Sequence, residues 1–260
     1  MRIRVKFAKF GCARFLGHLD VMRYFQKAFR RAGLPAAFSE GFHPHPLLSF
    51  AQPLSLSYTS DGEYFDLELT EVVPTDVLFH SLQAVMCEEI RIMRVTVLPD
   101  YRPNEKKITG MALITGAMYA ISLNNVPEGL RDVLSDFSEK PAFMIEKKTK
   151  TGTRPCDLRS GVHGIALYQS GVFDEVYSDG IFSHSAEEAA EGLCHADLYD
   201  GCAIIVCLDA GSERNIPADL FLSGILSMYG DSVKPEVRIH RMDLFGDKGE
   251  HKVPLWKIES

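Results

Sequence analysis

The sequence predicts an α+β fold of two tandem ferredoxin-like units, of which the second carries an insertion. Stretches typical of strands and helices follow the order β-α-β-β-α-β over the first hundred residues. A polar stretch with two prolines, residues 99–107, interrupts this pattern, and the same order then recurs with about 50 extra residues between its middle strands. We therefore expect a basic N-terminal unit at 1–100, a second unit at 108–245 with its insertion at about 150–200, and a C-terminal tail at 246–260.

The first unit begins with alternating charged and apolar residues over 2–10, a pattern typical of a strand with one buried and one solvated face. A helix is expected from about His18 to Ala32, where apolar residues recur at helical spacing, and Gly33 and Pro35 end it. The residues expected to face the core are Leu19, Met22, Phe25, Phe29 and Ala32. The unit continues with a strand starting at 47, a strand at 63–70, a helix at 74–87 and a strand at 90–98.

The second unit repeats the order with less regular spacing. Its insertion holds a further strand candidate at 162–168 and an acidic stretch at 174–198. The six elements expected for the unit itself are a strand at 111–123, a helix at 128–138, strands at 142–148 and 203–208, a helix at 217–229 and a strand at 236–244.

The composition is that of an ordinary globular protein, with 46% apolar and 24% charged residues. No apolar run reaches the roughly 20 residues that a membrane-spanning helix requires, and the alternating start is unlike a signal peptide. The six cysteines include no Cys-x-x-Cys pair, which favours reduced, mostly buried thiols over an iron–sulfur cluster or a structural zinc site. We therefore expect a cytoplasmic protein with no membrane partner and no cofactor of its own.

The formal net charge of −7 conceals a strong asymmetry along the chain. Residues 1–50 contain nine lysines and arginines against two acids, a net +7, whereas the other 210 residues contain 19 bases and 33 acids, a net −14. This asymmetry favours a basic surface that meets a polyanion, while the acidic remainder keeps the protein in solution.

Four of these bases, Arg23, Lys27, Arg30 and Arg31, are spaced i, i+4, i+7 and i+8 on the face of the first helix opposite its apolar residues. No acid lies between them, so a purely structural helix would gain from replacing one by glutamate. We interpret them, together with Arg14, as phosphate contacts of a nucleic acid. The alternatives are a solvated face and salt bridges to acids elsewhere in the fold.

Three histidines are further candidates. His18 opens the first helix, and His43 and His45 flank a proline in the following loop. Such side chains hydrogen-bond or stack on RNA bases, and this is the role we expect. In the alternatives they act as general acid or base in an RNA-cleaving site, or they bind a metal together with Asp20 or Glu40. No catalytic or metal-binding motif accompanies them, and ordinary loop histidines are a further alternative.

A second basic segment, the run KKTKTG at 147–152, contributes Lys147, Lys148 and Lys150 as candidate nucleic-acid contacts. Its alternative is a solvated hairpin. The turn at 210–215 leads into a predicted helix, where backbone N–H groups can hold a phosphate. Glycine and asparagine also form ordinary turns and caps, and we favour the cap.

The N-terminal segment contains three successive runs: RFLGHLDVMR at 14–23, KAFRRAGLP at 27–35 and SEGFHPHP at 39–46. These runs resemble the radical-SAM-associated (radical-SAM-linked) protein family, a bacterial domain of unknown function. The resemblance extends to the basic run at 147–152 and to the turn at 210–217. The chain departs from the family pattern at Gly17, where Ser is usual, and at His43, where Asn is usual, so the resemblance assigns no role to His43.

Members of that family are fused to, or encoded beside, cobalamin-binding-type radical SAM enzymes, near ribonuclease and ribosomal protein genes. The resemblance thus implies a radical SAM enzyme as partner and a link to RNA or a ribosomal component, and it implies no catalytic residue. With the basic segment, it predicts an accessory protein that binds RNA or a ribonucleoprotein. The alternatives are a stand-alone RNA-processing or metal-assisted hydrolase using His18, His43 and His45, and a protein-docking module that binds no nucleic acid.

Overall fold

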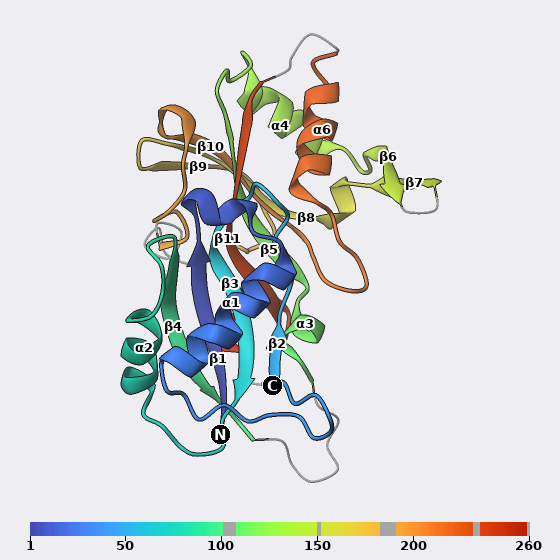
Figure 1. The fold of residues 1–260 in the computed structure, drawn as a ribbon. Helices are drawn as coiled ribbons and strands as arrows, with labels where there is room; N and C mark the ends of the chain where they lie inside the picture. Colours follow the sequence, from blue (N-terminus) through green and yellow to red (C-terminus); the bar gives the residue numbers. More distant parts are fainter. Residues whose placement is uncertain (101–107, 150–151, 183–190, 231–234, 259–260) are drawn as a thin grey trace.

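The computed structural model describes residues 1–260 apart from 101–107, 150–151, 183–190, 231–234 and 259–260 (Figure 1). The chain forms a mixed α+β fold around one large, mostly antiparallel sheet with strand order β4-β1-β3-β11-β5-β10-β8-β9. Two short strands extend it, since β2 pairs with β3 and β12 with β11, and β6 and β7 form a separate hairpin. The strands are β1 (Arg2–Lys9), β2 (Leu48–Phe50), β3 (Thr59–Glu68), β4 (Ile90–Leu98), β5 (Gly116–Leu123), β6 (Met144–Thr149), β7 (Gly152–Asp157), β8 (Val162–Gln169), β9 (Val172–Ser178), β10 (Cys202–Asp209), β11 (Val237–Lys248) and β12 (His251–Pro254).

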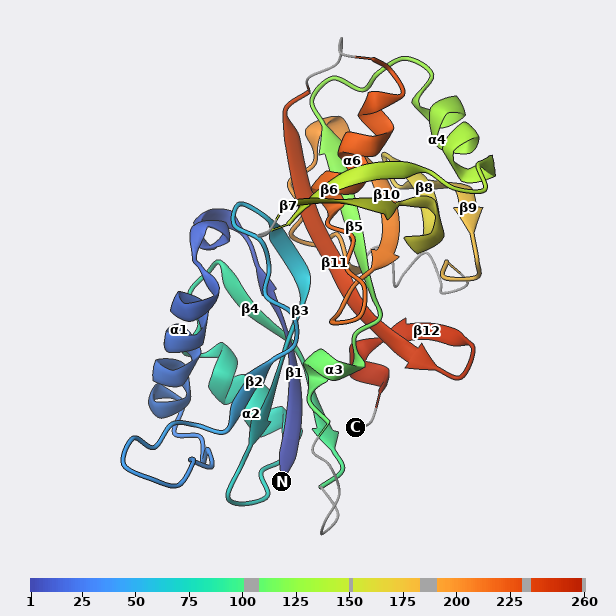
Figure 2. The same ribbon diagram turned by 90° about the vertical axis from the view of Figure 1, so that its right-hand side faces the viewer.

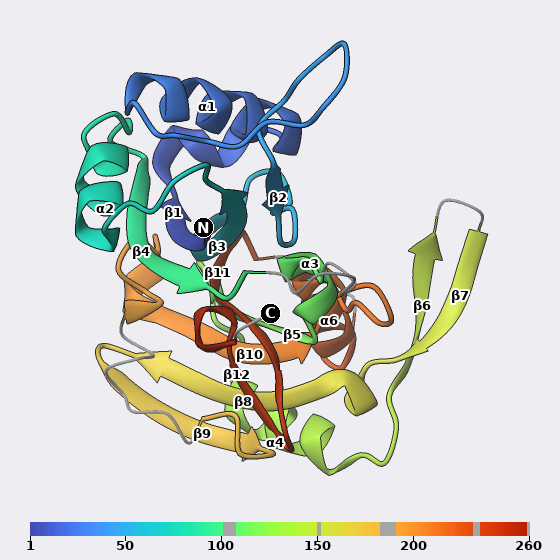
Figure 3. The same ribbon diagram turned by 90° about the horizontal axis from the view of Figure 1, so that it is seen from below.

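The elements of the first hundred residues lie where the sequence predicts them. The helices α1 (His18–Arg31) and α2 (Thr75–Gln83) cover the same face of the β4-β1-β3 sheet (Figure 1; Figure 3). Between α1 and the sheet lies an aromatic core, in which the ring of Phe25 is 4.8 Å from those of both Phe7 and Phe65. This packing fixes which face of α1 points outward.

Two predictions for the second half are wrong in detail. The strand expected at 142–148 is β6, which pairs with β7 in the separate hairpin instead of joining the sheet. Its place in the sheet is taken by β8, between β10 and β9, although the sequence assigned that segment to the insertion. The reason is apolar content, since Ile165 and Ala166 of β8 are fully buried whereas Met144 of β6 is 62% exposed.

The strand expected at 111–123 is shorter than predicted. Its first residues form α3 (Gly110–Leu113), and β5 begins only at Gly116. The Gly110 N–H donates to the Asp66 carboxylate at 3.1 Å, which fixes the short helix against β3. The helices α4 (Leu130–Glu139) and α6 (Ala218–Ser227) then pack against the C-terminal part of the sheet, where the Phe137 ring of α4 is 5.7 Å from the Phe221 ring of α6.

The basic face of β1 is not solvated, contrary to the prediction. All eight residues of this strand are buried, because the C-terminal segment of the chain covers the second face of the sheet. Arg4 pairs with Asp66 at 2.8 Å and donates two hydrogen bonds, each of 2.9 Å, to the backbone carbonyls of Leu255 and Ile258. The other buried bases of this strand are Arg2, Lys6 and Lys9.

The two halves join through parallel pairing of β3 with β11, at Thr59 with His240 and Ser60 with Arg241. The backbones approach closely here, since a Cβ on Gly62 would lie 2.3 Å from the Asp243 Cα. Only a residue without a side chain fits this crossing.

Residues 246–254 extend the sheet, in place of the separate tail that the sequence predicts. β11 continues to Lys248, β12 pairs with it, and η4 (Leu255–Lys257) leads back to β1.

No helix in the described ranges is long and apolar enough to cross a membrane. All six cysteines are free thiols, of which Cys207 is buried and Cys12, Cys87 and Cys194 are exposed, so burial is less general than cysteine usage suggests.

Candidate nucleic-acid interface

The outer face of α1 carries the predicted basic stripe. The inward face consists of Val21, Phe25, Ala28 and Phe29. All four bases of the stripe, Arg23, Lys27, Arg30 and Arg31, are exposed. Leu19, expected in the core, is 58% exposed, because the first turn of the helix extends past the sheet. Figure 2 shows α1 on the outer flank of the N-terminal half, on the opposite side of β1 and β3 from β12.

Internal contacts neutralise little of this stripe. Arg23 lies 3.8 Å from Asp20, but both side chains are more than half exposed, and such pairs contribute little. Arg31 donates to the Val85 carbonyl at 3.1 Å and lies 5.8 Å from the Tyr24 ring, without meeting a charge. Across the described part of the chain, no acid lies within ion-pair distance of Lys27 or Arg30. The salt-bridge alternative therefore does not account for the stripe.

The loop 38–46 adds an aromatic and histidine-rich tip beside the helix. A bridge between Phe38 and Pro46 closes its base, and Gly41 turns the chain with a φ of +113°. At the tip the Phe42 side chain is fully exposed and His43 is exposed as well. The exposed Phe42 ring thus leaves an aromatic face open to solvent at this tip.

The three histidines do not converge. The His18 ring is perpendicular to Phe50 at 5.4 Å, while His45 Nδ1 lies 2.9 Å from the Ser39 hydroxyl. In the ranges that the structure describes, no group of three or more His, Cys, Asp or Glu side chains is arranged to hold a metal ion. The geometry gives no support to a shared metal or catalytic site of His18, His43 and His45.

The second basic segment forms the β6-β7 hairpin, which projects from the C-terminal half of the molecule, away from the loop 38–46 (Figure 1; Figure 2). Lys148 and Arg154 are exposed near its tip. Lys147 is committed internally, because its Nζ donates to the Asn215 carbonyl at 2.6 Å. Lys150 lies outside the described residues.

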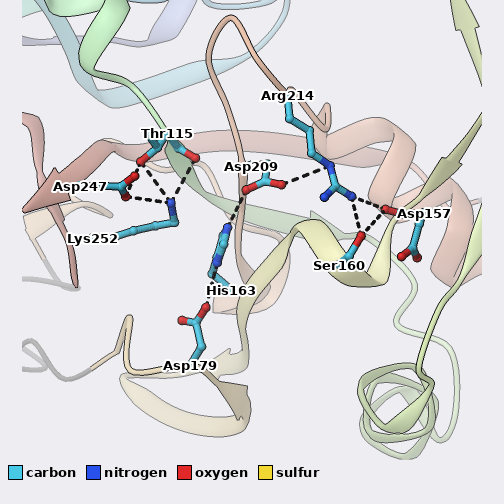
Figure 4. A network of polar contacts seen from close by, with 9 residues as sticks. All are labelled: Thr115, Asp157, Ser160, His163, Asp179, Asp209, Arg214, Asp247 and Lys252. Carbon is cyan, nitrogen blue, oxygen red and sulfur yellow. Dashed lines mark hydrogen bonds and ion pairs between the residues drawn. The ribbon is translucent and has the colours of Figure 1, made fainter. Parts of the chain in front are cut away.

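The turn at 210–215 packs closely against Ile114, and its Arg214 side chain contacts neighbouring polar groups, as in a structural turn. The Gly211 Cα faces the Ile114 carbonyl so closely that a Cβ there would lie 2.2 Å from its oxygen. Arg214 donates to the Ser160 hydroxyl at 2.8 Å and lies 3.2 Å from Asp209 (Figure 4). The Arg214 guanidinium, the charge that a phosphate would need here, is thus already engaged.

One charged network was not predicted by any motif. His163 lies between two carboxylates, with Nδ1 2.8 Å from Asp179 and Nε2 2.7 Å from Asp209 (Figure 4). Burial alone would lower the pKa of His163, but the hydrogen bonds with Asp209 and Asp179 outweigh it and raise the pKa overall. Beside it, Lys252 lies 3.1 Å from Asp247. These residues are isolated in the sequence, so no spacing signal marks them.

A second unpredicted cluster lies inside the junction of the two halves. The Asp61 carboxylate is completely buried and lies 2.5 Å from His195 Nδ1 and 3.3 Å from His240 Nε2. Burial by itself raises the pKa of Asp61, but hydrogen bonds from His240 and His195 outweigh it, so the pKa is lowered. Arg241 pairs with Glu63 in the same region. Asp61 and Glu63 of β3 thus link this strand to β11 of the other half.

Comparison with known proteins identifies one matching family. It is described as an uncharacterized protein conserved in bacteria, DUF2344, and the match covers residues 2–216. That range includes α1, the loop 38–46, the β6-β7 hairpin and the His163 network. No curated protein matches the chain. Since the match extends over most of its length, the chain belongs to the DUF2344 family of uncharacterized proteins conserved in bacteria.

Proposed function

We propose that this protein binds RNA, alone or in a ribonucleoprotein, through α1, the loop 38–46 and the β6-β7 hairpin, as an accessory partner of a radical SAM enzyme. The observation that carries the RNA proposal is the outer face of α1. Lys27 and Arg30 are exposed and meet no acid in the described ranges, although the chain as a whole is acidic. Uncompensated cations held on a rigid helix match the phosphates of a nucleic acid.

The neighbouring side chains favour RNA with unpaired bases over a regular duplex. The exposed Phe42 ring and His43 lie in the loop that follows the basic helix. Aromatic and histidine side chains stack on splayed bases, which single strands, bulges and loops provide. Arg23, Lys27 and Arg30 would hold the backbone, while the loop tip contacts bases.

The radical SAM part of the proposal rests on the resemblance of residues 14–46 to proteins associated with such enzymes. The scattered cysteines carry no iron–sulfur motif, so the cluster and the radical chemistry would belong to the partner. A cytoplasmic location suits this role and is in keeping with six free thiols.

We further infer that the fold is two ferredoxin-like units joined through the pairing of β3 with β11. Two observations support this. The N-terminal strands lie in the order β4-β1-β3-β2 and the C-terminal strands in the order β11-β5-β10-β8, so corresponding elements occupy corresponding positions. Each half also has one helix after its first strand and one before its last. The β6-β7 hairpin and β9 are then additions to the second unit.

The proposal is tested by measuring the affinity of the purified protein for total cellular RNA over a salt series. The decisive variant is Lys27→Glu/Arg30→Glu, and the matched control is Lys140→Glu/Lys248→Glu, which makes the same change in net charge at exposed sites away from α1. For single strands, each lost phosphate contact lowers the log–log salt slope by about 0.7. We expect a slope smaller by about 1.4 in the first variant and an unchanged slope in the control.

Equal loss of affinity in both variants would show that net charge alone is responsible. If the wild type binds no RNA, the basic face is better explained by docking to an acidic protein, and co-purification with the radical SAM enzyme becomes the next measurement. RNA that is cut by the protein alone, and left intact by the His18→Ala variant, would favour the hydrolase alternative.

A further inference from the structure

A hollow of about 280 Å³ lies where the two halves of the chain meet, next to the start of α1. We call it the junction hollow. Its lining comes from η1 (Gly11–Phe15), the turn before β3, the segment up to η3 (Tyr199–Gly201) and the first residues of β11 (Figure 1). Small-molecule sites range from about 300 to 1,000 Å³, so this hollow fits one flat group and not a large ligand.

Two aromatic surfaces line the junction hollow. The Phe15 side chain is 59% exposed and lines the hollow. In the same lining, the Arg238 guanidinium lies 3.8 Å from the centroid of the Tyr199 ring. Asp197 holds that guanidinium in place at 2.7 Å. A flat, partly exposed ring together with a fixed arginine–tyrosine stack is the kind of surface on which nucleobases pack.

The lining of the junction hollow also includes the cationic side chain of Arg14 and a turn at Ser57 with an unusual backbone conformation. Arg14 lies 5.0 Å from the Phe15 ring, and among the described residues it meets no acid within ion-pair distance. Its carbonyl accepts a hydrogen bond of 3.0 Å from the Ser57 N–H. Ser57 has a φ of +70°, a left-handed conformation that serine rarely adopts and that concentrates at functional sites. The turn therefore ties Arg14 to the rim of the hollow.

We infer that the junction hollow binds one unpaired nucleobase of a single-stranded RNA, with the base stacked on Phe15 and the adjoining phosphate on Arg14. This inference rests on the proposed function and adds to it a contact that duplex RNA cannot make, because paired bases do not leave the stack. The phosphate backbone of the same RNA strand then continues from Arg14 onto the lysine and arginine side chains of α1. This helix begins two residues after η1 in the chain.

The test compares wild type, Phe15→Ala and Lys27→Glu/Arg30→Glu in fluorescence-anisotropy titrations with an end-labelled single-stranded RNA and a duplex of the same length. Phe15→Ala removes no charge and no core contact. Loss of one base–aromatic stack lowers affinity about 5- to 140-fold, and we expect this loss for the single strand alone, with the salt slope unchanged. Val172→Ala, an exposed apolar residue on β9, is the control and should bind as wild type does.

The possible outcomes separate the two proposals. Unchanged single-strand binding by Phe15→Ala, with weaker binding by the α1 variant, overturns the junction hollow and leaves the proposed function intact. Equal effects of Phe15→Ala on single strand and duplex also overturn it. No RNA binding by the wild type overturns both proposals. Photo-crosslinking of thiouridine-containing RNA to the peptide that contains Phe15 or Tyr199 would support the inference directly, and crosslinks confined to the loop 38–46 would contradict it.

Discussion

The buried ion pair between Glu63 and Arg241 ties the two halves together, and we expect that neutralising Glu63 destabilises the whole protein. Arg241 is 1% exposed, its Nε donates to the Glu63 carboxylate at 2.9 Å, and its Nη2 donates to the Gln52 carbonyl at 2.8 Å. Burial alone would lower the pKa of Arg241, but Glu63 outweighs it and raises the pKa, so the guanidinium stays charged. Glu63→Gln therefore leaves a buried charge without a counter-charge.

The magnitude follows from that burial. Breaking a buried pair by removing one partner costs about 3–5 kcal/mol, a large fraction of the roughly 5–15 kcal/mol by which proteins are stable. At about 2–4 °C per kcal/mol for a chain of this size, the melting temperature should fall by roughly 6–20 °C. Thermal unfolding followed by circular dichroism measures the fall in melting temperature, and urea unfolding measures the change in the free energy of unfolding. Asp174→Asn is the control, because Asp174 pairs with Arg131 at 2.7 Å but on the surface, and it should leave the midpoint unchanged.

A double variant decides whether the charge is the cause. Glu63→Gln/Arg241→Met replaces the ion pair by neutral groups of similar size, and such replacements are often neutral or stabilising. We expect it to recover most of the lost stability. A double variant as unstable as the single one would refute the reasoning, since the loss would then come from packing around Glu63. A wild-type midpoint for Glu63→Gln alone would refute it as well.

Three further predictions follow from single contacts. Gly62→Ala should destabilise the protein by about 1–3 kcal/mol in urea unfolding, because its Cβ would lie 2.3 Å from the Asp243 Cα of β11; an unchanged midpoint would contradict the close approach of β3 and β11. His163→Gln should destabilise more at about pH 5.5 than at about pH 8.5. Burial opposes protonation of His163 but its aspartate partners raise its pKa overall, so the stability it contributes is present below the unfolded pKa and is lost as pH rises through the folded pKa; equal losses at both pH values would contradict this. Phe42→Ala should leave the unfolding midpoint unchanged, because the side chain is fully exposed, and weaken RNA binding in anisotropy titrations; a lowered midpoint would show a structural role for the loop.

Local patterns were sufficient to place the helices and strands of the first hundred residues because each of these elements packs an apolar face on a single core. The helical spacing of Phe25 and Phe29 and the alternation in β3 both report contact with that core. The second half is harder because two apolar or alternating stretches compete for one place in the sheet. The sequence shows that 162–168 and 142–148 are both strand-like, but not which of them pairs with β10, a contact about 40 residues further along.

The face of β1 shows why the candidate site could be predicted only in part. The alternation in 2–10 correctly predicts a strand but wrongly predicts that one face of it is solvated. That face is covered by residues more than 230 positions further along the chain. Lys6 forms an ion pair of 2.7 Å with Asp243, and Arg4 donates a hydrogen bond to the carbonyl of Leu255. The junction hollow was missed for the same reason, since Arg14 and Arg238 line one hollow only through the tertiary fold. The stripe on α1 was found because one helix contains it entirely.

The lysines and arginines of residues 1–50 therefore fall into two groups, one inside the fold and one on its surface, which the net charge of the segment does not distinguish. The bases of β1 are internal, and their charges are matched by Asp66, by Asp243 and by backbone carbonyls. The bases of η1 and α1 are external, on a chain whose remaining residues carry a net −14. Such a separation produces a field that orients an approaching polyanion toward α1 before contact, and salt screens it. The salt slope of RNA binding should then count only the lysines and arginines of the outer face, because a side chain held in an internal ion pair neutralises no phosphate and so releases no counterion from the RNA.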